Sequence, residues 1–312
     1  MSANKNHIDL EEQVLKTLLY FDIFNYPLKI GEILKFLRIR SQSPDELADC
    51  LKDLTDKQHV FRYGELYGLH ADDKNFRRRI KGNAEAQKWL RVAEKRARLL
   101  GKFPFVRAVM ASGSLSKGYM DEKSDLDFFI VTAPRRLWFA RTCLVMYKRI
   151  FLRNSHKHFC VNYFVDSEHL EIEEKNIFTA TELATLIPLF NHREYQKVID
   201  ENLWVKEFFP NFTVRNSSLL KDGDPSRIKD FSELLILPLT GWLDRWFMRV
   251  SLRRWMRLYG AGYSKEDFEI AFKTRRYVSK NHPNHYQKKV LERYQRKLSE
   301  FQNLFAQLTS YD

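Results

Sequence analysis

Apolar residues recur at helical spacing through the first forty positions of this chain and then alternate over two short runs. The first helix carries the set Leu10, Val14, Leu15, Leu18 and Leu19, which fall on one face at 3.6 residues per turn. A second helix is predicted over 30–37. A third begins at Ser43, which can cap it, with Pro44 at the first helical position. The runs 60–63 and 66–69 then predict a hairpin, which completes an N-terminal domain over residues 1–71.

This order of elements resembles a winged-helix domain, in which the third helix would contact DNA. Here that helix, residues 44–54, carries four acids and one lysine. An acidic helix repels the phosphates that line a DNA groove. We therefore favour a contact with protein, or a lid over a substrate, as the role of this domain, and DNA binding is the alternative.

Residues 72–102 predict one long helix that links this domain to the rest of the chain. It is strongly basic and has few interleaved acids: Lys74, Arg77, Arg78, Arg79, Lys81, Lys88, Arg91, Lys95, Arg96, Arg98 and Lys102. Two interpretations are open. The helix is a linker with a solvated face, or it is a basic ridge that grips a triphosphate or RNA.

The most informative segment lies between two strand-like apolar runs, 105–110 and 128–131. Asp125 and Asp127 stand two residues apart, so strand periodicity puts both carboxylates on one face. Two close carboxylates repel each other unless a cation lies between them, and Mg²⁺ prefers such oxygen ligands. The turn at Gly113 and Ser114 offers backbone N–H groups that can hold a phosphate. The segment therefore predicts a metal-dependent phosphate site.

These residues resemble the nucleotidyltransferase superfamily that includes DNA polymerase beta and the minimal nucleotidyltransferases. Its signature is a Gly-Ser turn, a helix start and then Asp-x-Asp in a hydrophobic strand, which Gly113-Ser114, the Lys117-Gly118 step and Ser124-Asp125-Leu126-Asp127 match without a gap. The resemblance covers roughly residues 104–170. It implies an α+β fold with a small mixed sheet as the nucleotidyltransferase core, over 103–178.

The resemblance also implies roles for single residues. Asp125 and Asp127 would bind Mg²⁺ (or Mn²⁺), Gly113 and Ser114 would contact the β and γ phosphates of a nucleoside triphosphate, and Lys117 would neutralise phosphate charge. Two metal ions would hold the attacking and leaving oxygens in line.

A third carboxylate of this family lies on a neighbouring strand, which here is expected over residues 158–166. Its position falls near Asn162, and an amide cannot serve as a base. Asp166 shares the face of Asn162 but lies about 13 Å further along at about 3.3 Å per residue, so we expect it to be a turn residue at the strand end. Another group must activate the acceptor, or the activity is weak or lost.

Beyond the core strands, residues 170–173 predict a last hairpin strand, and Thr179 or Thr181 is expected to cap the next helix. From residue 179 to 312 the pattern predicts helices only, as a C-terminal helical domain. The candidates are 180–190, 193–202, 230–258, 264–273 and 284–309, with a boundary loop over 210–229.

Two C-terminal segments have more than one interpretation. Helix 230–258 mixes Leu, Trp and Phe with five arginines. This composition suits a membrane surface, although such an apolar set more often packs on a core, which we favour. Residues 276–282 space Arg276 and His282 as in the helical nucleases that accompany minimal nucleotidyltransferases. We favour a polar helix terminus here, because Pro283 follows directly.

Composition narrows the classes of partner. The chain has 312 residues, 44% of them hydrophobic, and a net charge of +13 from 53 Lys and Arg against 40 Asp and Glu. This balance is typical of globular proteins with anionic partners such as nucleotides or nucleic acid, or of a solvated basic surface. Three widely spaced cysteines have no metal-ligand spacing and suit a reducing compartment. We expect no signal region, no transmembrane segment and a cytoplasmic location.

The leading hypothesis is a Mg²⁺-dependent nucleotidyltransferase that moves a nucleoside monophosphate from a nucleoside triphosphate to an acceptor hydroxyl. The acceptor, a small molecule, a protein side chain or an RNA end, is unknown. The alternative is a catalytically weak or inactive nucleotide-binding module that contacts nucleic acid or protein. A third possibility is nucleic-acid processing through the basic helix over 72–102.

Overall fold

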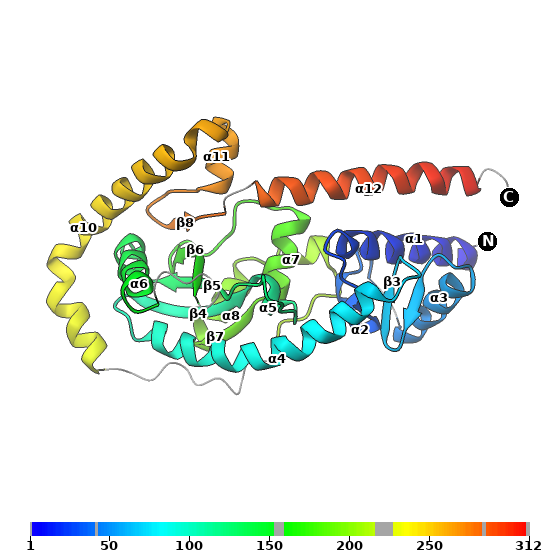
Figure 1. Ribbon diagram of the computed structural model, residues 1–312, viewed down its shortest axis with the longest axis horizontal. Coiled ribbons are helices and arrows are strands. Elements are labelled where there is room, and N and C mark those ends of the chain that lie inside the picture. The colour runs from blue at the N-terminus through cyan, green and yellow to red at the C-terminus, as the bar shows by residue number, and fades with distance from the viewer. Residues whose placement is uncertain (1, 41–42, 153–158, 216–226, 283–284, 310–312) are drawn as a thin grey trace.

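The computed structural model describes residues 2–40, 43–152, 159–215, 227–282 and 285–309, and it gives no side-chain description for 2–8, 161–162 and 304–309. The fold is mixed α and β with two small sheets, in agreement with the predicted α+β class. Figure 1 shows an elongated molecule in which both chain ends lie at the same end of the long axis.

The N-terminal unit is built from three helices and a three-stranded antiparallel sheet in the order β1-β3-β2. Its elements are α1 (Ser2–Asp22), β1 (Leu28–Lys29), α2 (Ile30–Phe36), α3 (Pro44–Asp56), β2 (Phe61–Tyr63) and β3 (Leu66–Gly68). The expected helix start is confirmed: Ser43 accepts a hydrogen bond from the backbone N–H of Asp45, and Pro44 is the first helical residue. The apolar stripe of α1, with Val14 and Leu18, is buried in the core of this unit.

A single long helix, α4 (Lys74–Gly101), runs from the N-terminal unit along the second sheet (Figure 1). Its inner side is made of small residues, including Gly82, Ala86, Ala93 and Ala97, which are buried. A Cβ on Gly82 would lie 2.2 Å from the ring of Tyr119, so the helix can approach the loop after the Gly-Ser turn only because that position is glycine.

The second sheet is mixed and has five strands in the order β7-β4-β5-β6-β8. The strands are β4 (Val106–Ser112), β5 (Asp127–Thr132), β6 (Cys160–Asp166), β7 (Ile187–Phe190) and β8 (Val278–Lys280). Strands β5 and β6 pair in parallel, and the other neighbours pair antiparallel. The parallel pair needs a crossover, which α6 (Leu137–Phe151) provides.

Each face of this sheet belongs to a different apolar core. Phe128 and Ile130 of β5 pack with α4, α6 and α10 (Arg227–Tyr259). Phe129 and Val131 point the other way, toward α7 (Ile177–Thr185) and into the core shared with the N-terminal unit.

The remaining elements are α5 (Gly113–Ser116), α8 (His192–Asp200), α9 (Val205–Phe208), η1 (Gly260–Gly262), α11 (Lys265–Ala271) and α12 (Tyr286–Thr309).

The prediction of helices only from residue 179 onward is wrong, because β7 and β8 complete the second sheet. Strand β7 is four residues long and includes Pro188, which an edge strand tolerates. Strand β8 is buried although it carries Ser279 and Lys280, so it lacks the alternation that marks a half-buried strand. Since residues 276–282 contain this strand, Arg276 and His282 do not share a helix.

The predicted strand at 170–173 is also absent. Leu170 and Ile172 are buried as their alternation suggests, but their backbone pairs with a side chain. The Asn202 side chain accepts from the Ile172 N–H at 2.8 Å and donates to the Leu170 carbonyl at 2.8 Å. The next helix, α7, begins at Ile177 and is capped by Asn176, which accepts from the Thr179 N–H, rather than by Thr179 or Thr181.

Candidate functional site

The predicted site lies where β4 ends and β5 begins. Ser112, the last residue of β4, pairs with Asp127, the first residue of β5. Gly113 follows with φ at +65°, and a Cβ at this position would lie 2.3 Å from Oδ2 of Asp127. The backbone of the Gly-Ser turn therefore passes directly against the Asp127 carboxylate, an approach that only glycine permits.

The environment of Asp127 disfavours its charge. Burial raises the pKa of Asp127 to about 7, and the charges of Glu182 and Asp125 add to the rise, while Lys117 and a hydrogen bond with Cys160 oppose it. Asp125 is half-buried and lies just before β5. The two predicted carboxylates are thus near enough for one to affect the other, in a setting where a bound cation would stabilise both.

Glu182 is a third carboxylate at this site, and it was not predicted from the sequence. It lies on α7, where it is the only charged side chain. Its Oε1 is 2.7 Å from Nζ of Lys117, and its Oε2 accepts from the Gly113 N–H at 3.4 Å. The signal that could have found it is a lone acid in an otherwise apolar and hydroxyl-bearing helix.

Lys117 is turned back over the Gly-Ser turn. Besides Glu182, its ammonium group donates to the Gly113 carbonyl at 3.1 Å. Ser114 lies half-buried in α5, and its carbonyl accepts from the N–H groups of Lys117 and Tyr119. Every residue predicted to hold phosphate or metal is therefore within this one turn and the strand beside it, apart from the third-ligand position on β6.

On β6 the side chain of Asn162 lies outside the described residues. Its backbone falls where the register between β5 and β6 shifts, since Phe128 pairs with Val161 and Phe129 with Tyr163. Asp166 pairs with Thr132, at the other end of β5 from Asp127. It is buried, contacts His169 at 2.8 Å and accepts from the backbone N–H of Glu168 in the following turn, as expected of a strand-end residue.

A buried lysine of α6 approaches the candidate site, at the start of β5. Lys148 is 6% exposed. Burial lowers its pKa, and the neighbouring Cys160 and Asp125 counteract the decrease. Lys148 was not predicted, because its place on α6 reads as an ordinary basic position in the last turn.

A small cavity of about 60 Å³ adjoins the site on the face of the sheet that Asp127 occupies. Its floor is the stacked pair Phe129 and Tyr163, whose ring centroids are 5.1 Å apart. Ser112 and Glu182 connect it to the Gly-Ser turn. The cavity therefore joins an aromatic floor to the Glu182 carboxylate.

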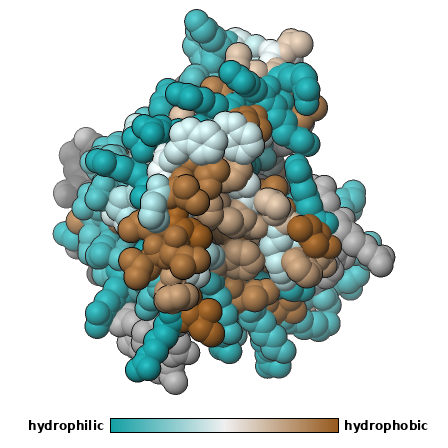
Figure 2. All heavy atoms as spheres, turned by 90° about the vertical axis from the view of Figure 1, so that its left-hand side faces the viewer, coloured by the Kyte–Doolittle hydropathy of each residue, from teal (hydrophilic) through white to brown (hydrophobic). Residues whose placement is uncertain are grey.

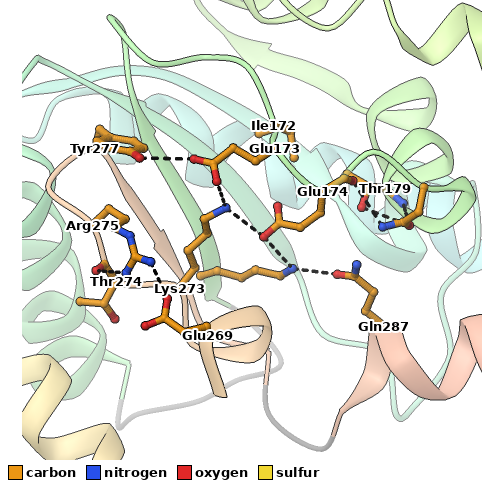
Figure 3. Close-up of polar contacts among 12 residues, drawn as sticks. Ile172, Glu173, Glu174, Thr179, Glu269, Lys273, Thr274, Arg275, Tyr277 and Gln287 are labelled. Carbon is orange, nitrogen blue, oxygen red and sulfur yellow. Dashed lines mark hydrogen bonds and ion pairs between the residues drawn. The ribbon is translucent and has the colours of Figure 1, made fainter. Parts of the chain in front are cut away.

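Glu174, Lys280 and Gln287 line this cavity and belong to a network of charged and polar side chains (Figure 3). Lys273 lies 2.7 Å from Glu173 and 3.1 Å from Glu174, and Lys280 donates to Gln287 at 2.8 Å. One oxygen of Glu174, Oε2, is buried without a partner among the described residues. His282 also lines the cavity, and burial lowers its pKa to about 4, so its imidazole is neutral.

The N-terminal unit contacts the site from the opposite side of α5. The hydroxyl of Tyr26 donates to the Lys117 carbonyl, and Lys35 donates to the Ala184 carbonyl at 2.7 Å. Between the two units lies a cleft of about 380 Å³, lined by Lys35, Arg79, Lys117 and other residues. Burial, together with the charge of Arg215, lowers the pKa of Lys35 to about 8.

Comparisons with known proteins give this site no precedent: no family model, no curated protein and no solved structure matches the chain. Within the described part of the chain, no group of three or more His, Cys, Asp or Glu side chains is arranged to hold a metal ion. The function must be inferred from the residues themselves.

Proposed function

We propose that this protein is a Mg²⁺-dependent nucleotidyltransferase, which transfers a nucleoside monophosphate from a nucleoside triphosphate to an acceptor hydroxyl. The acceptor oxygen would bond to the α-phosphorus, the bond from that phosphorus to the bridging oxygen would break, and pyrophosphate would leave. The observation that carries the proposal is the close approach of Gly113 to the Asp127 carboxylate, because it brings phosphate-binding N–H groups and a metal-binding oxygen to one point.

The residues fit a divalent cation. Asp127 and Asp125 are neighbouring carboxylates in a half-buried setting. The raised pKa of Asp127 means that its negative charge is unfavourable there without a counter-ion. Asp125 and Asp127 would hold Mg²⁺, or Mn²⁺ in its place. The ion would supply charge neutralisation for the phosphates and the leaving pyrophosphate.

Glu182 is the best candidate to accept the proton of the acceptor hydroxyl, a role for which Asn162 is chemically unsuited. It lies beside Asp127 and lines the cavity with the aromatic floor. In the described conformation Lys117 pairs with Glu182. An incoming triphosphate would compete for this lysine and so release the carboxylate.

The first test is Mg²⁺-dependent binding of a nucleoside triphosphate, measured by calorimetry, with pyrophosphate release measured in parallel. Asp127→Asn is expected to abolish the Mg²⁺-dependent part of binding, because the variant loses a charged ligand. Glu122→Gln is the matched control, since Glu122 is an exposed acid in the loop just before the site. Unchanged binding and turnover in Asp127→Asn would refute the proposal.

The Lys117–Glu182 ion pair also favours a second candidate, a nucleotide-binding module without catalysis, because it engages both the phosphate-binding cation and the candidate base. Tight Mg²⁺-dependent binding with no pyrophosphate release, in the wild type and in Glu182→Gln alike, would support this alternative. Loss of release in Glu182→Gln alone, with binding retained, would support the transferase.

A further inference from the structure

Helix α10 is attached to the rest of the protein through polar contacts on its inner side as well as through apolar packing. Glu233 binds the guanidinium of Arg107 at 2.7 and 2.8 Å and accepts from the Phe105 N–H at 2.6 Å. Eleven residues further on, Asp244 is buried and accepts from the N–H groups of Trp138 and Phe139 at 2.8 and 3.0 Å. Near its C-terminal end, Trp255 is buried against Trp138. These contacts fix which side of the helix faces inward.

The outward side of the first half of α10 is apolar. Ile228 is 83% exposed, Phe231 67% and Trp242 64%. Helical periodicity puts these residues on one stripe with other exposed side chains: Leu235, Leu239 and Trp246. Trp242 and Trp246 stack with ring planes 9° apart. Figure 2 shows apolar side chains gathered on the face that α10 covers, an exposed patch of the kind that marks an interaction surface.

The same stripe becomes basic in the second half of the helix. Arg245, Arg249, Arg253 and Arg257 are spaced four residues apart and are exposed. None of the four forms an ion pair with a described residue. From Ile228 to Arg257 the stripe holds no carboxylate, because the acids of α10 lie on its other sides. An apolar segment of roughly 27 Å, at 1.5 Å per residue, is thus followed by a row of cations on one face.

We propose that α10 lies on an anionic lipid surface, with Ile228–Trp246 in the interface and the arginine row on phosphate head groups. Exposed Trp and Leu beside Arg are the composition of a helix that lies in the membrane plane. Among the described residues no helix is long and apolar enough to cross a bilayer, so the contact is peripheral. Nucleic acid would satisfy the arginines but not the exposed apolar segment.

A second copy of the chain fits the stripe poorly. Two α10 helices packed antiparallel along their whole length would bury each arginine row against the other copy's apolar segment, and two packed parallel would set arginine against arginine. Burying unpaired charge in this way is costly. Two helices paired over their apolar segments alone would leave both arginine rows uncovered, so no arrangement offers the arginines a carboxylate as counter-charge. Lipid phosphates supply that charge, so the observations favour a lipid surface.

The test is flotation of the full chain with vesicles of phosphatidylcholine alone and of phosphatidylcholine mixed with phosphatidylglycerol. We expect binding to the mixed vesicles. Arg249→Gln with Arg253→Gln should lower the partition coefficient about 25-fold, at about fivefold per arginine. Trp242→Ser with Trp246→Ser should lower it at least about tenfold. The matched controls are Arg91→Gln with Arg98→Gln and Ile80→Ser, exposed positions on α4, and both should bind as the wild type does.

Tryptophan fluorescence that shifts to the blue on binding, and loses this shift in the Trp242/Trp246 variant, would support insertion of the apolar segment. Failure of the wild type to float with anionic vesicles would overturn the proposal. So would equal loss of binding in the α4 controls, which would indicate a non-specific basic surface. A stable dimer in solution that the Trp242/Trp246 variant disperses would assign the face to self-association instead.

Discussion

The start of β5 and the outward face of α10 both differ from the usual distribution of polar and apolar side chains. The first gathers charge away from water, and the second exposes apolar side chains to it. At the start of β5, carboxylates from two elements gather in a half-buried place, and the pKa of Asp127 rises as a result. On α10, large apolar side chains point into water while acids hold the inner side. In the isolated protein the half-buried charge costs stability, and the exposed apolar surface costs solubility. Each also indicates a ligand that would remove the cost, a cation for the first and a lipid surface for the second.

The largest expected effect is on the free energy of unfolding, and it should separate a tryptophan on the inner face of α10 from one on the outer face. Trp255→Ala removes a buried side chain that packs on Trp138 and Phe272, and it should lower the free energy of unfolding by about 3–5 kcal/mol. Trp242→Ala removes an exposed side chain and should change it by less than about 0.5 kcal/mol. Chemical denaturation measures both. A comparable loss in Trp242→Ala would mean that the outer face serves stability.

The Gly-Ser turn should be the most sensitive backbone position of the candidate site. Gly113→Ala forces a Cβ against Oδ2 of Asp127 at a positive φ, and it should lower the free energy of unfolding by about 2 kcal/mol and abolish triphosphate binding. Gly31→Ala is the matched control, because nothing lies within 4 Å of its Cβ and it is helical. That variant should raise stability by about 0.5 kcal/mol. Similar effects of Gly113→Ala and Gly31→Ala on stability would contradict the close approach of the Gly113 backbone to Asp127.

An effect of opposite sign is expected when the carboxylate itself is neutralised. Native Asp127 keeps its proton up to about pH 7, whereas an unfolded aspartate loses it near pH 4. The native state therefore binds more protons between these values, and stability falls as pH rises through this window. Asp127→Asn removes this penalty and should raise the free energy of unfolding at pH 8 by up to about 4 kcal/mol, at about 1.4 kcal/mol per pKa unit, with little effect below pH 4.

Denaturation at several pH values, with Glu122→Gln as the control, measures this effect. Added Mg²⁺ should stabilise the wild type and leave Asp127→Asn unchanged, which would link the strained carboxylate to cation binding. A variant that is less stable than the wild type at pH 8 would show that the Asp127 charge is already well compensated.

The parts of the fold that were predicted from sequence depend on local chemistry. Ser43 caps its helix through a neighbour two residues away, and the strands on either side of the Gly-Ser turn follow from their own apolar runs. The segment 170–173 could not be assigned in this way, because its backbone partner is Asn202, about thirty residues later in the chain. Strands β7 and β8, which were not predicted, likewise depend on pairing with β4 and β6, which lie far from them in sequence.

The candidate site was predicted where its residues are adjacent in sequence and was incomplete where they are not. Asp125, Asp127 and the Gly-Ser turn share one segment, whereas Glu182 and Lys148 reach the same point from helices. The exposure of α10 was missed for a similar reason. Its Leu and Trp set predicts a buried face, and only the contacts of Glu233 and Asp244 with distant residues turn that face outward.

Asp244 has a further consequence for how this protein can be divided. Helix α6 has no side-chain cap of its own, and its first N–H groups are satisfied by this carboxylate from more than one hundred positions later in the chain. A shortened protein that ends before α10 would leave the start of α6 without its acceptor, directly after β5. The sheet that carries the candidate site and the helix proposed to lie on lipid are therefore one folding unit, and neither can be studied by simply deleting the other.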